Sequence, residues 1–314
     1  MLRVVLSRLA ALIPLVLVAS FTVFLLLQLT QVDPATVRLG DAATEESLAA
    51  FRQQIGVDRP VLVQYWSWLV GAVQGDLGTS WANSTPVTDS LMTRFPVTLA
   101  ISVGALVVGL IIGIPAGIAA GIRAGKSTDA LLTGGASVGQ AIPGFWLALL
   151  LVAYVAMQSS IFPATGYVSP DRGVGDWLLS IALPSVALGA AAAGAFARQT
   201  RAGFVRVLQE PYIRTAVAGG LSRRRILWRT ALRNASVPVV TTIAGQAAVL
   251  IGGAVVIEQV FALPGLGQLV LNAIRNGDMP VVLGFVVLMA LLMAVIQFLL
   301  DLTYALVDPR VRAS

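Results

Sequence analysis

Six apolar runs, each long enough to cross a membrane as a helix, constrain the fold of this chain more than any other feature. An α-helix rises 1.5 Å per residue, so about 20 residues cross the roughly 30 Å hydrocarbon core of a bilayer. The runs are Leu9–Leu29, Val97–Ile122, Leu131–Met157, Ile181–Phe204, Val237–Ile257 and Val281–Leu300. Of the 314 residues, 57% are hydrophobic and only 11% are charged, whereas about a quarter is charged in a soluble domain. The sequence therefore predicts an all-α membrane protein with six transmembrane helices in a single domain, residues 1–314.

The distribution of Lys and Arg predicts the orientation of these helices. Six crossings place both termini on one side, and if that side is cytoplasmic, fifteen of the 21 basic residues lie inside. Cytoplasmic loops of membrane proteins carry such an excess. The net charge of +6 is therefore explained by the basic cytoplasmic loops of a protein in a lipid membrane. No nucleic-acid partner is expected. The first run is interpreted as a retained helix because it is too long for a signal peptide and no small-residue cleavage site follows Leu29.

The segment between the first two runs, residues 30–96, is too long for a simple loop. Thr44 followed by two acids is typical of a helix start, and Gly56 can end that helix. Pro60 can open a second helix and Pro86 a third. Aromatic residues suited to a membrane interface follow Pro60, namely Tyr65, Trp66 and Trp68. We expect a small helical cap on the outer surface; the alternative is a solvated linker.

Four glycines at a strict spacing of four residues mark the second run. They are Gly109, Gly113, Gly117 and Gly121. Residues four apart share one helix face, so these glycines form a smooth stripe that a neighbouring helix can approach closely. Pro115 in the same run indicates a local kink. We interpret the stripe as a helix-packing surface rather than a ligand site.

The chemistry available inside the runs is narrow. Asp301 and Glu258 lie near the ends of runs, whereas ion-coupled transporters use ionisable groups near mid-membrane, which speaks against a stand-alone secondary transporter. The chain has no His and no Cys, which excludes the common zinc sites and His-based catalysis. The apolar runs also contain no paired central carboxylates, which speaks against an intramembrane enzyme. No GxxxxGK[ST] loop is present. We expect no metal, no cofactor and no catalytic residue in this chain, and any ATP must bind elsewhere.

The loop between the fourth and fifth runs, residues 205–236, is the most informative segment. From Arg198 to Arg233 there are nine basic residues and one acid, Glu210. Pro211 can begin a short helix, and the paired glycines Gly219 and Gly220 can end it and turn the chain back. A slim helix of this kind suits docking into a groove of a partner. A basic helix lying at the membrane interface is the alternative, and the composition favours neither.

This loop resembles the coupling loop, or EAA loop, of ABC importer permeases. Arg-Thr-Ala at 214–216 stands at the EAA position, Gly220 at the glycine, and residues 230–233 at the I-x-LP end. Arg-Thr-Ala in place of EAA, and Thr-Ala-Leu-Arg at the I-x-LP end, depart from the general pattern. They resemble the variant of dipeptide and oligopeptide permeases of the DppB/OppB type. The matching residues are Tyr-Ile-Arg-Thr-Ala at 212–216, Gly-Leu-Ser at 220–222, Ala-Leu-Arg-Asn-Ala at 231–235 and Pro238. Val217 and Gly219 replace the usual basic residues, a change expected to weaken charge contacts with the partner.

Six further motifs resemble that family in the same order along the chain. They are Val-Asp-Pro-Ala at 32–35, Gln-Gly-Asp-Leu-Gly-Thr-Ser at 74–80, Ile-Pro-Gly-Phe-Trp at 142–146, Phe-Pro-Ala-Thr-Gly-Tyr at 162–167, Glu-Gln-Val-Phe-Ala-Leu-Pro-Gly-Leu-Gly at 258–267 and Leu-Val-Asp-Pro-Arg at 306–310. The resemblance therefore covers the whole chain. It implies the type I importer permease fold in a bacterial cytoplasmic membrane, with both termini cytoplasmic.

The resemblance also implies partners and cargo. A permease of this family pairs with a second, homologous permease of the DppC/OppC type, so this chain supplies half of the translocation path. Two ATPase subunits, which bind ATP and Mg, lie on the cytoplasmic side, and a solute-binding protein delivers di- or oligopeptides from outside. Nickel, glutathione or haem are alternative cargoes of the same architecture. The residues implied in ATPase coupling are Glu210, Pro211, Tyr212, Ile213, Arg214, Thr215, Ala216, Gly219, Gly220 and Leu221.

Polar and aromatic groups within the runs are candidates for the wall of the path. They are Gln140, Phe145, Trp146, Gln199, Gln246 and Glu258. Helix packing or interhelical hydrogen bonding is the alternative role of each.

Overall fold

The regular elements of the described residues are helices, apart from an isolated β-bridge between Thr79 and Pro86. The structure is a computed structural model and describes residues 2–30, 32–40 and 42–307. The helices are α1 (Leu2–Gln28), α2 (Pro34–Leu39), α3 (Glu45–Ile55), α4 (Val61–Val73), α5 (Val87–Ile122), α6 (Ser127–Ala141), α7 (Gly144–Leu151), α8 (Val174–Gln209), α9 (Pro211–Ala218), α10 (Arg223–Arg225), α11 (Leu232–Val260), α12 (Leu266–Arg275) and α13 (Met279–Val307). The last motif of the sequence, at 306–310, and the basic residues Arg310 and Arg312 lie largely outside the described residues.

The chain divides into two compact units. The first holds residues up to Val97 together with Pro264–Val295, and the second holds Thr98–Leu263 together with the chain from Ile296. Helices α5 and α13 each run through a boundary between the units.

Four described helices, α5, α8, α11 and α13, are long and apolar enough to cross a bilayer. The pair α6–α7 also qualifies as one span, although it is bent by 93°. In α1 the described apolar stretch, Leu12–Gln28, is shorter than these. The described helices thus give four spans, or five with the bent pair.

The prediction of one continuous helix at 131–157 is wrong. The helix stops after Ala141 and begins again at Gly144, and it ends in a π-helical turn, Val152–Ala156. Pro143 causes the break because it has no N–H to donate and restricts the residue before it to extended angles. Ile142 accordingly has φ −74° and ψ 122°. Gln140 and the pair Phe145 and Trp146 therefore lie on different helices.

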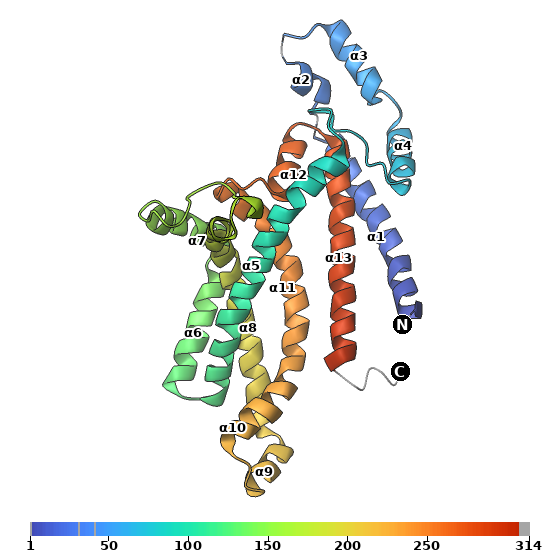
Figure 1. Ribbon diagram of the computed structural model, residues 1–314. Coiled ribbons are helices and arrows are strands. Elements are labelled where there is room, and N and C mark those ends of the chain that lie inside the picture. Colours follow the sequence, from blue (N-terminus) through green and yellow to red (C-terminus); the bar gives the residue numbers. More distant parts are fainter. Residues whose placement is uncertain (1, 31, 41, 308–314) are drawn as a thin grey trace. The chain divides into compact units, whose positions relative to one another are not determined.

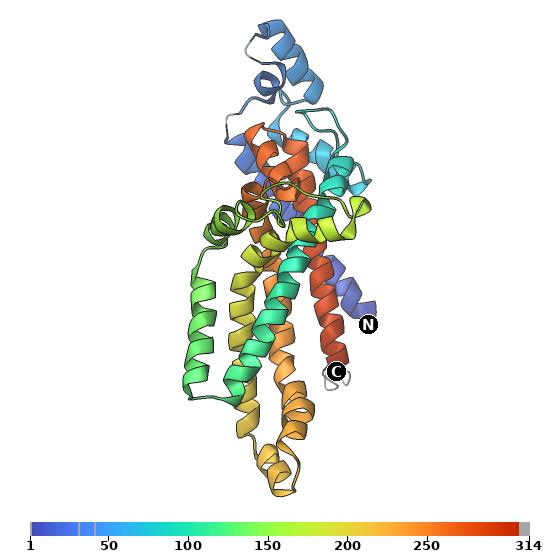
Figure 2. The same cartoon turned by 60° about the vertical axis from the view of Figure 1, so that its left-hand side comes forward.

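Helix α8 is the centre of the second unit (Figure 1). Two-thirds of its apolar window is buried, 67%, against 22–39% for the other long spans. Helix α5 runs parallel to α8, since Gly104 lies beside Ser185 and Gly121 beside Phe204. Helices α6 and α11 run antiparallel to α8 and pack against it (Figure 2). Gly203 in α8 approaches Ala235 in α11, and Leu188 approaches Gly253.

The glycine stripe lies where α5 meets α8. A Cβ on Gly117 would come within 2.6 Å of Thr200 Cβ, and one on Gly121 within 2.6 Å of Phe204 Cβ. A Cβ on Gly113 would lie 2.8 Å from Phe196 Cβ, whereas Gly109 has more room, with Ala192 Cβ at 3.1 Å. Bare backbone at these positions lets the two helices pack more closely than side chains would permit.

The first unit contains the segment between α1 and α5. Thr44 caps α3 by accepting from Ser47 N, and Gly56 ends that helix at φ +76°. Helix α4 follows Pro60 and packs on α1 through Tyr65, whose ring lies 5.0 Å from the Phe21 ring and whose hydroxyl is 3.0 Å from Ser20 Oγ. These starts and stops were predicted. The expected third cap helix is instead the first part of α5, which continues through Pro96 without a break.

Two helices of the first unit were not predicted, and both begin with a local signal. Helix α2 is capped by Asp33, which accepts from Ala35 N, and α12 begins after Gly265. The turn after α12 is fixed by Asp278, which is 2% exposed and accepts from Trp81 N at 3.1 Å and from Ser80 Oγ. This carboxylate joins the segment before α5 to the segment before α13.

Candidate functional site: the helical tip between α8 and α11

Helix α9 begins and ends where its sequence requires. Pro211 occupies the first turn, where its missing N–H costs nothing. At the other end, Leu221 N donates to Ala216 O at 3.1 Å and Gly220 N donates to Val217 O at 3.0 Å. Gly220 has φ +77°, so this is a Schellman motif with the left-handed residue at Gly220. Gly219 has φ −76° and does not make the left-handed turn.

One buried residue attaches α9 to the rest of the second unit. Ile213 is 5% exposed and lies in an apolar cluster. The other buried members of that cluster are Phe204, Val207, Ile226, Ala231 and Ala235. The cluster therefore joins α9 to the end of α8 and to the start of the α11 segment. A displacement of α9 has to be passed on to these two helices, because interiors are close-packed.

The segment after α9 is more ordered than a loop. Ser222 caps α10 by accepting from Arg225 N, and a π-helical turn, Ile226–Ala231, leads directly into α11. Helix α8 likewise extends to Gln209. The region predicted as a coupling loop, 205–236, is therefore two long helix ends joined by α9 and two short turns. Local composition predicts neither the π-helical turn nor the extension of α8 and α11 into this region.

The outward face of this tip combines apolar and basic side chains. Tyr212, Val217, Leu221 and Trp228 are exposed, with Trp228 at 56%. The same segment carries exposed arginines, namely Arg206, Arg214, Arg223, Arg224, Arg225, Arg229 and Arg233. We call these eleven residues the tip surface. Of the predicted coupling residues, Pro211, Thr215, Gly219 and Gly220 are also exposed, Glu210 and Ala216 are partly buried, and Ile213 is buried. Trp228 was not among the predicted residues.

The candidate path residues lie on four helices and differ in exposure. Phe145 and Trp146 are about half exposed on α7, and Gln140 is exposed near the end of α6. Gln199 on α8 and Gln246 on α11 are partly buried. Glu258 on α11 is fully buried and accepts a hydrogen bond of 2.5 Å from Thr98 Oγ1. Within this chain Glu258 is therefore enclosed, whereas the two aromatic residues are open to a neighbour.

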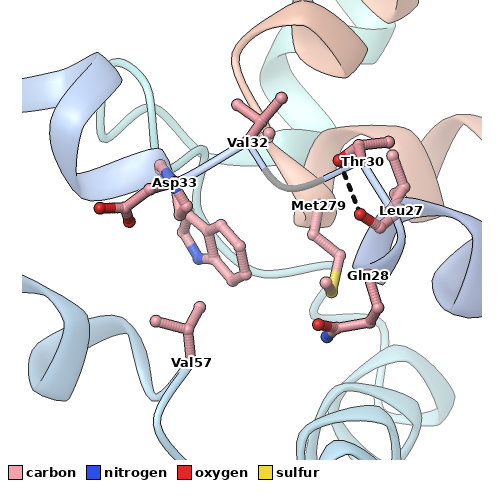
Figure 3. Close-up of a pocket in the computed structure, with 10 residues that line it drawn as sticks. Leu27, Gln28, Thr30, Val32, Asp33, Val57 and Met279 are labelled. Atoms are coloured by element: carbon pink, nitrogen blue, oxygen red, sulfur yellow. Dashed lines mark hydrogen bonds between the residues drawn. The ribbon is translucent and has the colours of Figure 1, made fainter.

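Cavities lie in the described part of the first unit. One of about 270 Å³ is lined by residues that include Gln28, Asp33, Val57 and Met279, and another, of about 340 Å³, lies beside Trp68. In Figure 3, Val57 and Asp33 lie across the first cavity from Gln28 and Met279. Asp33 is engaged by Arg52 at 2.6 Å, and this guanidinium lowers the pKa of Asp33 to about 2. Neither cavity brings together groups for catalysis, and no three His, Cys, Asp or Glu gather to hold a metal in the described part of the chain.

Comparison with known proteins identifies the family. The model of the family described as binding-protein-dependent transport system inner membrane component matches residues 113–313. The chain belongs to this family. A second model, for the N-terminal part of such membrane components, matches residues 1–102. The resemblance found in the sequence is thereby confirmed: the chain is an ABC importer permease, a multi-pass membrane protein, and not itself an ATPase.

Curated relatives match this permease over nearly its whole length. A probable peptide ABC transporter permease of Sinorhizobium fredii is 37% identical over 98% of both chains. A putative peptide transport system permease of Brucella abortus is 38% identical over 99% of both chains. The glutathione transport system permease GsiC of Escherichia coli O6:H1 is also 38% identical over 99% of both chains.

A solved structure shows the fold of part of this permease. The inward-facing MetNI methionine ABC transporter has a chain that matches with a TM-score of 0.53 at 21% identity, over 69% of this chain and 96% of that chain. As an importer permease, this chain works in general with an ATPase and a binding protein.

Proposed function

We propose that this permease forms half of the path of an ATP-driven importer for di- and oligopeptides, including glutathione. The full-length relatives with 37–38% identity are named for peptides or glutathione, which favours these cargoes over nickel or haem. A second, homologous permease would supply the other half of the path. Two ATPase subunits would bind the ATP and Mg, and an outer solute-binding protein would deliver the peptide.

A topology of six crossings is part of the proposal. They would be α1, α5, the α6–α7 pair, α8, α11 and α13, with both termini in the bacterial cytoplasm. The contacts of the α6–α7 pair with α8 support its crossing: Asp129, at its start, contacts Arg201, whereas Gly144 lies beside Ala187. Those two positions on α8 are 14 residues apart, or about 21 Å along the helix. The whole chain would act as one transmembrane permease domain.

The tip surface is the proposed docking site of an ATPase subunit. The observation that carries this assignment is that α9 begins at Pro211, ends in a Schellman motif, is attached through Ile213 and is otherwise largely exposed between α8 and α11. Exposed aromatic and Arg side chains are the residues enriched where protein partners bind. ATPase closure would move α9 as a rigid body and pass this motion to α8 and α11.

The test compares two glycines in matched surroundings. Gly220 and Gly40 have φ +77° and +80°, and a Cβ added at either position would have no atom within 4 Å. Each ends a short helix, α9 and α2 respectively, but only Gly220 belongs to the tip. The complete importer in proteoliposomes would be assayed for ATP hydrolysis and for uptake of a labelled dipeptide, glutathione, nickel and haem.

Gly220→Arg is expected to detach or uncouple the ATPase while the chain still inserts, and Gly40→Arg is expected to transport nearly normally. Uptake of peptide without ATP, or normal uptake by Gly220→Arg, would contradict the coupling assignment. Uptake of nickel or haem in place of peptides would overturn the cargo.

A further inference from the structure

A buried carboxylate held by four donors lies where α6 begins. Asp129 is 4% exposed and sits in the first turn of α6. Its oxygens accept from Arg201 Nη2 at 2.7 Å and from Arg201 Nε, from Gly125 N at 2.9 Å and from Thr133 Oγ1 at 3.1 Å. A guanidinium that binds both oxygens of one carboxylate fixes distance and orientation together.

A second contact joins the same two helices further along. At Gly194 of α8 a Cβ would overlap the Ala136 carbonyl oxygen and would lie 3.4 Å from Gln140 Cβ. Helix α6 is therefore attached to α8 both at its start, through the ion pair, and near its end, through bare backbone. Two separated attachments prevent one helix from rotating or sliding along the other without breaking one of them.

The positions of the two charged residues connect the tip with the path candidates. Arg201 lies eight residues before the end of α8 at Gln209, and α9 follows at Pro211. Asp129 lies on α6, which passes at Pro143 into α7 with its half-exposed aromatic residues Phe145 and Trp146. Burying charges is costly, and an apolar contact could stabilise this packing equally well. The ion pair instead supplies a fixed register between the helix that carries α9 and the helix that carries α7.

We propose that Asp129 and Arg201 are positioning residues that make α6 and α7 follow α8 when α9 is displaced. This inference rests on the proposed docking of an ATPase at the tip surface and names the internal contact that transmits its motion. When the ion pair is absent, α8 still moves with α9, but α6 and α7 are held on α8 by packing alone, including the contact at Gly194. Packing alone can slip along the helix axis, so ATP would be hydrolysed with an incomplete movement of α7 and the amount of peptide imported per ATP falls.

The experiment measures that ratio in the complete importer, reconstituted in proteoliposomes with its partner subunits and binding protein. Arg201→Met removes every donor of the guanidinium but keeps a long side chain. Arg198→Met is the matched control, because Arg198 lies one turn earlier on α8 and has no hydrogen bond or ion pair with any described residue. We expect Arg201→Met to hydrolyse ATP at close to the native rate and to import about fivefold less peptide per ATP, or lower still. The control keeps the native ratio.

A native ratio in Arg201→Met overturns the inference, since a contact that only stabilises the fold would change the quantity of assembled importer and not its stoichiometry. If native importer takes up no peptide with ATP, the proposed function fails and this inference with it. If the native importer transports peptide and Arg201→Met imports the same amount of peptide per ATP, only this inference is overturned.

A second measurement covers the case in which Arg201→Met does not assemble. The chain contains no Cys, so Asp129→Cys combined with Arg201→Cys can be joined by a short bis-methanethiosulfonate and released by a thiol reductant. We expect the joined variant to recover most of the native ratio and to lose it on reduction, with treated native importer as control. A joined variant that remains uncoupled overturns the inference.

Discussion

Single glycines in α5 decide how closely that helix packs on α8. A Cβ at Gly117 would come within 2.5 Å of the Ala197 carbonyl oxygen and 2.6 Å of Thr200 Cβ. A backbone oxygen cannot move aside as a flexible side chain can, so Gly117→Ala forces the helices apart. We expect this substitution to cost about 1–3 kcal/mol, the usual cost of overpacking, and to lower the unfolding temperature of the purified importer in detergent.

The control for this residue-scale prediction is Gly245→Ala in α11, where no atom lies within 4 Å of the added Cβ. It is expected to be neutral or slightly stabilising, because Ala is the better helix former. Gly109→Ala should fall between the two, since its nearest atoms lie at 3.1 Å. Equal unfolding temperatures for Gly117→Ala and Gly245→Ala would show that α5 does not pack on α8 through the stripe.

Helices α6 and α7 show how one proline sets the shape of an element. The pair is bent by 93° at Ile142 and Pro143, and an interior proline costs a helix about 3 kcal/mol. Pro143→Ala removes that cost, so we expect the helix to continue and the bend to open. Spin labels at Leu131 and Leu149, both exposed, can report this by pulsed electron resonance in a chain that has no native Cys. The distance between them should lengthen.

Pro184→Ala is the matched control, because Pro184 lies inside α8 without interrupting it, and it should leave the label distance unchanged. A constant distance in Pro143→Ala as well would mean that packing of α7 on α8, rather than the proline, holds the bend.

At the same scale, the sequence predicted those features that depend on neighbouring residues. The caps at Thr44 and Gly56, the start at Pro60 and the α9 helix from Pro211 are local signals, and the structure has them all. The break at Pro143 was missed because hydropathy alone carries no information on whether an apolar run is straight. The π-helical turn before α11 and the Asp129–Arg201 pair were missed because they depend on contacts between distant segments.

The whole molecule depends on whether the α6–α7 pair crosses the bilayer or turns back within it. If it crosses, the α5–α6 turn and the α7–α8 connection lie on opposite sides; if it is re-entrant, they lie on the same side. Ala124 and Asp171 are exposed residues in these two connections, and Glu46 on α3 is an exposed residue of the first unit. Single Cys at each of them can be labelled in intact cells with a thiol reagent that does not cross membranes.

We expect Asp171→Cys and Glu46→Cys to react from outside and Ala124→Cys to react only after the membrane is opened. The physical reason is that the α6–α7 pair contacts α8 from Arg201, beside Asp129 of α6, to Ala187, beside Gly144 of α7. This stretch of α8 is about 21 Å long, which is most of the hydrocarbon thickness. Protection of Asp171→Cys in intact cells would make the pair re-entrant, and α8 would then cross antiparallel to α5, contrary to their contacts at Gly104 and Gly121. The number of crossings would then be odd, the two termini would lie on opposite sides, and α9 would no longer share a compartment with the α5–α6 turn.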